Sequence, residues 1–204
     1  MFVAIGMRST IIQALAELMP QEQIVPPDWQ GHTVAYLADV PPDCRFVLAG
    51  GYLAGKRASE QSAEEHARTY WLNTEQPMML ASQALDELPA ARVCIIGSWS
   101  AVTGSFDENY AAAKDTIHRW AKRQHIAPPR QLVVIAPPII ADSRMTRARA
   151  DYPEILQRRP HCCAMDVARA IKAALWETGP DASARVIYLP ATAGPEPHEL
   201  EPPR

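Results

Sequence analysis

Tyr110 and Lys114 lie four residues apart in a segment with helical periodicity, Glu108–Gln124. Four residues make about one helical turn, so both side chains are expected on the same helical face. An ammonium group near a phenol favours the phenolate, which predicts that the pKa of Tyr110 is lowered. A tyrosine that titrates nearer neutrality suits general acid–base catalysis. The pair therefore predicts a proton-transfer site, although the same spacing also occurs on many solvated helices.

Ser98 stands twelve residues before Tyr110 and directly follows Arg92–Ile96, an apolar run that is typical of a buried strand. Open α/β sheets bind their ligands at the carboxyl ends of the strands. A hydroxyl in that place could polarise a substrate carbonyl. Because Gly97 and Ser100 are its neighbours, Ser98 could equally be a turn residue that ends the strand.

The elements that must position these residues follow a regular order along the chain. Short apolar runs alternate with segments of helical period, which predicts an α/β fold: a doubly wound parallel sheet in three layers, with about six or seven strands. Two runs, Val93–Ile96 and Leu132–Ile135, are apolar throughout and are expected as interior strands. Ile24–Val25 and Thr33–Leu37 could be two further short strands. The predicted strands are Phe2–Ile5, Phe46–Ala49, Arg92–Ile96, Leu132–Ala136 and Arg185–Leu189, and the predicted helices are Thr10–Leu18, Ser62–Leu88, Glu108–Gln124 and Ala164–Trp176.

Length, composition and charge argue against a nucleic-acid-binding protein and against a membrane protein. The 204 residues predict one domain over 1–190 and a mobile tail, rich in Pro and Glu, at 191–204. Lys and Arg number 20 against 23 Asp and Glu, which argues against binding to nucleic acid. No apolar run approaches the ~20 residues of a membrane helix, and the start MFVAIGMRST does not resemble an export signal, so we expect a soluble, cytoplasmic protein. Reduced thiols and no metal site are expected from the four cysteines, Cys44, Cys94, Cys162 and Cys163.

Five landmarks follow one another along the chain: Ala49-Gly50, Asn73, Ser98, the Tyr110 and Lys114 pair, and APPIIADSRMT at 136–146. In this order they resemble the short-chain dehydrogenase/reductase family over roughly Gly6 to Leu189. The resemblance implies a Rossmann-like fold and hydride transfer between a nicotinamide ring and the carbonyl or alcohol carbon of a small substrate. It also implies NADP or NAD as the cofactor and a homodimer or homotetramer.

The resemblance also implies roles for individual residues. Tyr110 would be the acid and base, and Ser98 would hydrogen-bond the reacting oxygen. Lys114 would hold the cofactor ribose and lower the pKa of Tyr110, and Asn73 would steady a water molecule that leads away from Lys114. Arg8 could reach a phosphate, which slightly favours NADP over NAD. The residues implied to bind the cofactor are Gly6, Arg8, Ser9, Ile11, Asp39, Ala49, Gly50, Tyr110, Lys114, Pro138, Ala141 and Ser143.

The amino-terminal part departs from the family pattern, which has a turn Thr-Gly-x-x-x-Gly-x-Gly. Only Gly6 is kept, and Thr10 and Ile12 replace the second and third glycines. Both add bulk where the backbone approaches the pyrophosphate and where the helix packs on the strand. Either the helix is slightly displaced and residues 8–11 still hold phosphate, or no dinucleotide binds. The interval from Gly6 to Gly50 is also shorter than in the family by roughly one strand–helix unit. The adenine side of the cofactor site, where Asp39 would touch adenine, therefore matches the family less well than the rest.

Three functions stay open from the sequence. An oxidoreductase is favoured because Asn73, Ser98, Tyr110 and Lys114 occur together without an evident structural reason. The alternatives are a binding or regulatory protein that has lost the dinucleotide, and a structural subunit that supports a catalytic relative. Segment 139–160 would set the substrate. Its arginines could bind an acidic group or simply be solvated: Arg144, Arg147 and Arg149.

Overall fold

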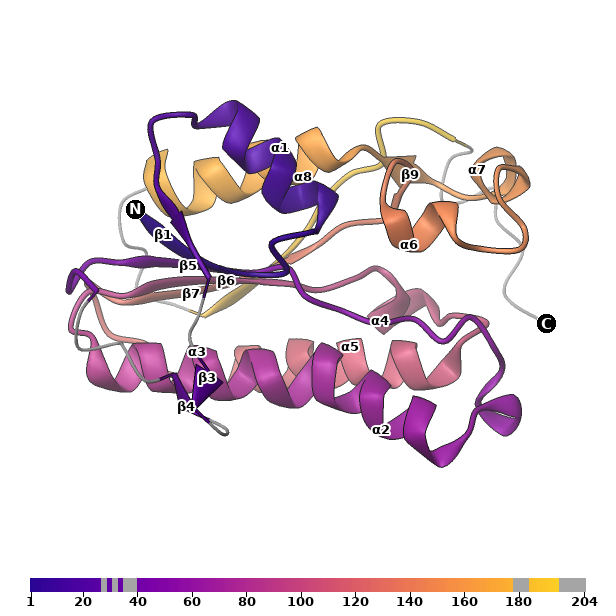
Figure 1. Cartoon of the computed structure of the whole chain (residues 1–204), viewed down its shortest axis with the longest axis horizontal. Coiled ribbons are helices and arrows are strands. Elements are labelled where there is room, and N and C mark those ends of the chain that lie inside the picture. The colour runs from indigo at the N-terminus through magenta and orange to yellow at the C-terminus, as the bar shows by residue number, and fades with distance from the viewer. Residues whose placement is uncertain (27–28, 31–32, 35–39, 178–183, 195–204) are drawn as a thin grey trace.

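The computed structural model describes residues 1–26, 29–30, 33–34, 40–177 and 184–194. Its centre is a six-stranded parallel sheet with the order β10-β7-β6-β5-β1-β2 (Figure 1). The predicted α/β, doubly wound Rossmann-like fold is confirmed. The strands of this sheet are β1 (Phe2–Ile5), β2 (Ile24–Val25), β5 (Arg45–Leu48), β6 (Arg92–Ile96), β7 (Gln131–Ala136) and β10 (Arg185–Tyr188).

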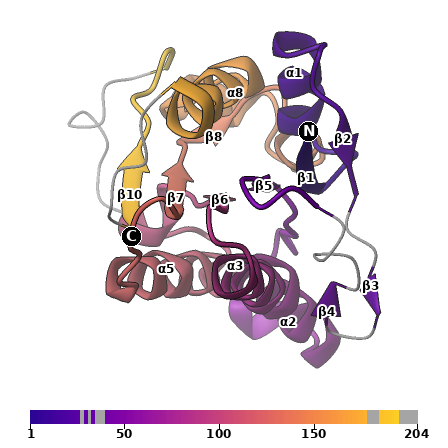
Figure 2. The ribbon, with the colours of Figure 1, turned by 90° about the vertical axis from the view of Figure 1, so that its left-hand side faces the viewer.

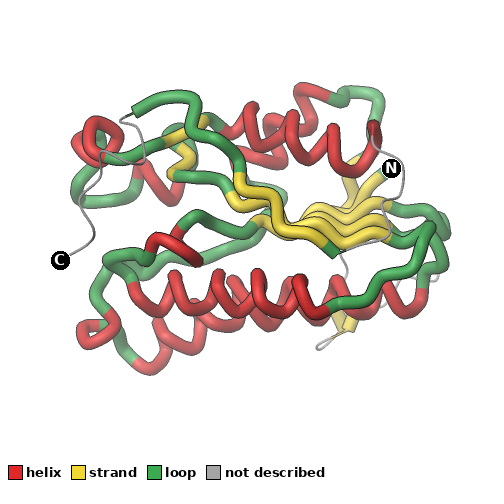
Figure 3. Tube along the Cα trace, turned by 180° about the vertical axis from the view of Figure 1, so that it is seen from behind, coloured by secondary structure: helices red, strands yellow, loops and turns green. Residues whose placement is uncertain are grey.

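Helices cover both faces of the sheet (Figures 1 and 3). One face carries α1 (Thr10–Leu18) and α8 (Ala164–Lys172), which a π-helical turn, Ala173–Glu177, continues. The opposite face carries α2 (Ala63–Tyr70), α3 (Gln76–Glu87) and α5 (Glu108–Arg123). Shorter helices lie in the connections: a 3₁₀ turn at Ala58–Glu60, α4 (Ser100–Thr103), α6 (Arg144–Arg147) and α7 (Glu154–Arg158).

Local sequence explains where these helices begin. Ser62 and Glu65 form a capping box at the start of α2, Ser9 caps α1, and Asp107 caps α5. The predicted helix Ser62–Leu88 is divided by a π-helical turn, Trp71–Glu75, which lies between α2 and α3. This π-helical turn contains Asn73, and such turns often mark functional sites.

Two hydrophobic clusters fill the space between the sheet and its two helical layers. Successive side chains of a strand point to opposite faces. Phe2 and Ala4 accordingly pack in the cluster beneath α1 and α8, whereas Val3 packs in the cluster above α3 and α5. All six residues of β7 are buried, and β6 lies between β5 and β7. Both predicted interior strands are confirmed.

The described sheet ends at β2 and contains no third strand beside it (Figure 2). The chain between β2 and β5 instead forms an antiparallel pair of two-residue strands, β3 (Trp29–Gln30) and β4 (Thr33–Val34), and β4 lies beside α3. Residues 35–39, which include Asp39 and the end of the predicted strand Thr33–Leu37, lie outside the described residues. The shortening seen in the sequence thus corresponds to an absent strand–helix unit in the described part.

A small parallel pair, β8 (Ile139–Ile140) and β9 (His161–Cys162), lies between β7 and β10 in the chain and outside the main sheet. Residues 191–194, assigned to the tail from sequence, are hydrogen-bonded to this pair: the His161 N–H donates to the Ala193 carbonyl at 2.9 Å. Residues 195–204 lie outside the described residues. Within the described ranges, no helix has the length and apolarity needed to cross a bilayer. All four cysteines are free thiols.

Candidate active site

The carboxyl end of β6 brings three of the predicted residues together. Helix α5 runs beneath this strand and turns Tyr110 and Lys114 toward it. The Tyr110 hydroxyl is hydrogen-bonded to the side chain of Ser98. The Nζ of Lys114 donates to the Ile96 carbonyl at 2.8 Å and lies 5.7 Å from the centroid of the Tyr110 ring. A serine, a tyrosine and a lysine thus converge at the sheet edge where α/β folds bind ligands.

The predicted direction of the Tyr110 pKa is wrong for this structure. Burial of the hydroxyl raises the pKa of Tyr110 above its ordinary value, although the hydrogen bond with Ser98 opposes this rise, and the charge of Asp107 adds to it. Lys114 does not reverse the direction because its ammonium is bound to a carbonyl rather than to the phenol oxygen. The phenol of the ligand-free protein is therefore protonated at neutral pH.

The pKa of Lys114 is strongly lowered by its buried position. Only 3% of the residue is exposed, and burial lowers the pKa of Lys114 to about 8. An ammonium group carries three donors, and the Ile96 carbonyl accepts one of them. Lys114 therefore combines a positive charge at neutral pH with a titration that falls just above the physiological range.

Asn73 lies in the π-helical turn and binds the segment after β5. Its Nδ2 donates to the Tyr52 carbonyl at 2.7 Å and to the Thr69 carbonyl at 2.9 Å, and its Oδ1 accepts from the Tyr52 N–H at 3.4 Å. These bonds satisfy a carbonyl in its own helix and fix the chain that follows Gly50. The side chain of Asn73 thus positions the loop after β5, and the contact to a water molecule that the resemblance implies stays a prediction.

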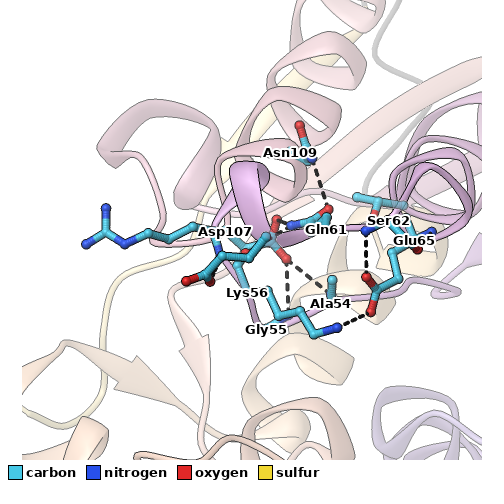
Figure 4. A network of polar contacts seen from close by, with 11 residues as sticks. Ala54, Gly55, Lys56, Gln61, Ser62, Glu65, Asp107 and Asn109 are labelled. Carbon is cyan, nitrogen blue, oxygen red and sulfur yellow. Dashed lines mark hydrogen bonds and ion pairs between the residues drawn. The ribbon is translucent and has the colours of Figure 1, made fainter.

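Asp107 is a further residue of this site that was not predicted from the sequence. Its carboxylate is fully buried and accepts from the Tyr110 N–H at 3.0 Å and from Gln61 Nε2 at 2.9 Å. The other oxygen accepts from the N–H groups of Ala54 at 3.1 Å and Gly55 at 3.2 Å (Figure 4). An Asp three residues before the first buried turn is an N-cap signal that could have been recognised.

The first turn of α5 extends this network. Glu108 accepts from the Ala58 N–H at 2.7 Å, and Asn109 donates to the Gln61 side chain at 2.9 Å. The loop that joins β5 to α2 is consequently held against the start of the helix that carries Tyr110. Because the loop and the helix share hydrogen bonds, a shift of one displaces the other.

On the other side of the sheet edge, the turn between β1 and α1 meets the end of β5 closely. Gly6 has a φ of +84°, and a Cβ there would lie 2.8 Å from the Ala49 carbonyl oxygen. A Cβ on Gly50 would lie 2.8 Å from a methyl group of Ile5. These contacts explain why both positions are glycine. Ser9 then begins α1, because its Oγ accepts from the Ile11 N–H at 3.2 Å.

The residues that replace two glycines leave the start of α1 suited to phosphate. Ile12 is only 2% exposed and packs with Ile11 in the core between α1, α8 and the sheet, so its bulk points away from the sheet edge. Thr10 is partly exposed and Arg8 is exposed. The N–H groups of a first helical turn lack intrahelical acceptors and bind anions. The N–H groups of Ser9 and Ile11 are bound to Gly6 and to the Ser9 hydroxyl, so the other backbone N–H groups at the start of α1 are the ones that fit the pyrophosphate of a dinucleotide.

Backbone and side-chain hydrogen bonds fix the segment that follows β7, residues 137–147. Pro138 is buried, and the Ala141 N–H donates to the Cys162 carbonyl at 2.9 Å. Ser143 caps α6, with its Oγ accepting from the Thr146 N–H at 3.0 Å. Ala141 and Ser143 thus use their polar groups within the segment. Of the three arginines, Arg149 pairs with Asp151 at 2.7 Å, and Arg144 and Arg147 are exposed.

Comparison with solved structures identifies the class of fold. The chain superposes on the protein lin1944 from Listeria innocua with a TM-score of 0.73 and 16% identity, covering 92% of this chain and 98% of that one. A short-chain dehydrogenase/reductase, glucose/ribitol dehydrogenase, from Brucella melitensis gives 0.72 and 20%, covering 92% and 94%. The closed form of a serine dehydrogenase complexed with NADP+ gives 0.72 and 13%, covering 93% and 94%.

The fold of this protein is therefore that of short-chain dehydrogenases/reductases. No family model and no curated sequence matches the chain. At sequence identities of 13–20%, these similarities show the fold alone. The coverage of lin1944 also shows that a chain of nearly this length forms the same fold.

Proposed function

We propose that this protein is an oxidoreductase that uses NADP or NAD to interconvert a small carbonyl compound and its alcohol. The observation that carries the proposal is the hydrogen bond between the Tyr110 hydroxyl and the Ser98 side chain, with Lys114 one turn further along the same helix. The serine dehydrogenase of the same fold was solved with NADP+, and an alcohol dehydrogenase of this fold from Thermococcus sibiricus was solved with 5-hydroxy-NADP, which supports this cofactor class. The homodimer or homotetramer implied by the resemblance is carried forward as part of the proposal.

The protonation state of the site favours carbonyl reduction at neutral pH. The raised pKa keeps Tyr110 protonated, so its O–H donates a proton to the oxygen of a carbonyl substrate. The Ser98 hydroxyl donates a hydrogen bond to the same oxygen. The buried ammonium of Lys114 then stabilises the phenolate that remains. Alcohol oxidation requires the phenolate at the outset and is therefore expected to accelerate as the pH rises.

The cofactor would be held by two groups of residues. The backbone of residues 8–11 would bind the pyrophosphate, with Arg8 beside an additional phosphate, and Lys114 would bind the ribose next to the nicotinamide. When bound, the nicotinamide ring supplies or accepts the hydride. Asp107 keeps Tyr110 in place through the backbone, and Asn73 keeps the loop after β5 in place.

Cofactor titration tests the proposal directly. NADPH and NADH are titrated separately, followed by their fluorescence and by quenching of the five tryptophans. Oxidation of the bound reduced cofactor is then measured with a set of aliphatic and aromatic aldehydes and ketones. Tyr110→Phe is expected to bind cofactor as the wild type does and to lose turnover by about 10²- to 10⁴-fold. Equal turnover in this variant would remove Tyr110 from the mechanism.

A binding or regulatory protein without a dinucleotide is the second candidate, and the replacement of two glycines by Thr10 and Ile12 favours it. It predicts no saturable binding of either nucleotide at millimolar concentration. That result would overturn the oxidoreductase and would direct attention to proteins that co-purify with this chain.

A further inference from the structure

His118 lies one turn beyond Lys114 on α5 and contacts the same strand end. The residue is only 2% exposed. Its Nε2 accepts a hydrogen bond from the Ser98 N–H at 3.4 Å, and its Nδ1 lies 3.3 Å from the hydroxyl of Tyr188 on β10. A Cβ on Gly97 would lie 2.3 Å from Nε2. The imidazole thus occupies the space that a side chain at position 97 would need.

The partners of His118 determine its tautomer. A backbone N–H only donates, so the Nε2 that faces Ser98 must carry a lone pair. In a neutral imidazole the proton is then on Nδ1, which donates to the Tyr188 hydroxyl oxygen. Burial and the nearby charges of Lys114 and Lys122 disfavour the imidazolium, and the charge of Asp115 only partly opposes them. His118 therefore acts as a hydrogen-bonding bridge between β6 and β10.

Three residues of α5, each four apart, contact three successive residues at the end of β6. Lys114 binds the Ile96 carbonyl, His118 packs on Gly97 and binds the Ser98 N–H, and Tyr110 is hydrogen-bonded to the Ser98 side chain. Tyr110 and Ser98 must be mutually oriented for proton transfer, and small displacements of catalytic groups are costly.

We propose that His118 is a positioning residue: it holds the main chain of Ser98 so that the Ser98 hydroxyl faces Tyr110, and Tyr188 keeps the imidazole in the tautomer that this requires. This role rests on the proposed oxidoreductase function. It differs from simple core packing, because a packing role needs the volume of the ring and not the acceptor at Nε2.

Three variants separate these roles. His118→Leu keeps apolar bulk and removes the acceptor, whereas His118→Gln restores an acceptor at similar reach. Thr116→Ala is the matched control, because this α5 side chain binds Ala112 and Tyr70 away from β6. We expect His118→Leu to lower kcat by about tenfold or more with an unchanged KM for NADPH, and His118→Gln to recover most of kcat. Equal kcat in His118→Leu and the wild type overturns the role.

Nitrogen NMR of the imidazole gives a readout that does not depend on activity or on the folding of a core variant. In the wild type we expect a neutral ring protonated at Nδ1, and in Tyr188→Phe an increased fraction protonated at Nε2. A wild-type ring protonated at Nε2 overturns the proposal, because that atom could not accept from Ser98. Absence of turnover in the wild type overturns the proposed function and this role together, whereas turnover that is insensitive to His118→Leu overturns this role alone.

Discussion

The two halves of the sheet's carboxyl edge follow the dehydrogenase pattern to different degrees. Around β6 and α5, the residue types of the proposed proton relay are all present, and the structure gathers three of them, Ser98, Tyr110 and Lys114, at one strand end. At β1 and α1, two glycines are replaced, and the described sheet has no strand beyond β2. The relay half is thus complete in its side chains, whereas the nucleotide half is shortened and bulkier.

The relay half depends on particular side chains, whereas the nucleotide half depends on backbone groups. Proton transfer needs particular side-chain groups, so substitution of a relay residue removes the chemistry. Phosphate binding at a helix start uses backbone N–H groups and the helix dipole, which do not depend on the side chain. Ile12 can therefore replace a glycine when its side chain is accommodated in the core behind α1.

The largest effect on stability is expected from restoring a glycine in the nucleotide half. Ile12→Gly removes a buried side chain from the α1 and α8 core and adds backbone freedom inside the helix, so the free energy of unfolding should fall by about 3–5 kcal/mol. Urea denaturation followed by circular dichroism measures this loss. Thr10→Gly, at a partly exposed site, is the control and should lose less than about 0.5 kcal/mol. A loss of similar size in both variants would contradict the burial of Ile12 in the core.

In the relay half, Asp107→Ala should lower the free energy of unfolding by about 2–4 kcal/mol, because it removes the α5 cap and leaves buried N–H donors without an acceptor. Chemical denaturation gives the magnitude, and turnover should fall as the start of α5 loosens around Tyr110. Glu108→Ala is the matched control, since its carboxylate is exposed and accepts from the Ala58 N–H of the same loop. If the two variants were equally stable, Asp107 would not be the residue that holds the loop to the helix.

The pH dependence of stability tests the buried charge of Lys114. The unfolded protein holds this proton up to its ordinary pKa of 10.5, whereas the folded protein releases it near 8. The unfolded state thus binds more protons above about pH 8, so folding stability should rise with pH in that window, by about 2 kcal/mol up to pH 9.5. Lys114→Met should lack this rise, measured as the difference between the two denaturation series. Parallel pH curves would place the ammonium in contact with solvent.

The smallest effect should come from Arg8, at the surface of the nucleotide half. An exposed guanidinium–phosphate pair contributes about 0.5–1 kcal/mol, so Arg8→Ala should weaken NADPH binding by roughly two- to fivefold and leave NADH binding nearly unchanged. Fluorescence titration of both nucleotides against wild type and variant measures the difference. A loss of the same size for NADH would show that Arg8 contacts a group common to both cofactors.

Much of the fold could be predicted because its signals are local. The predicted strand Arg92–Ile96 coincides with β6, and the predicted helix Glu108–Gln124 differs from α5 by one residue. Continuous apolar runs identify strands that are buried on both faces, and caps identify helix starts. The roles of Asp107 and His118 were not predicted, because their partners are up to 70 residues away in the chain.

The amino-acid sequence by itself determined the parallel sheet, the helices that cover it and the order of the residues proposed for the relay, since these follow from periodicity and residue type. Only the tertiary structure decided that the Tyr110 pKa is raised rather than lowered and that the bulk of Ile12 lies in the core. The physical reason is that desolvation and packing depend on groups brought together from distant parts of the chain, which no local pattern records.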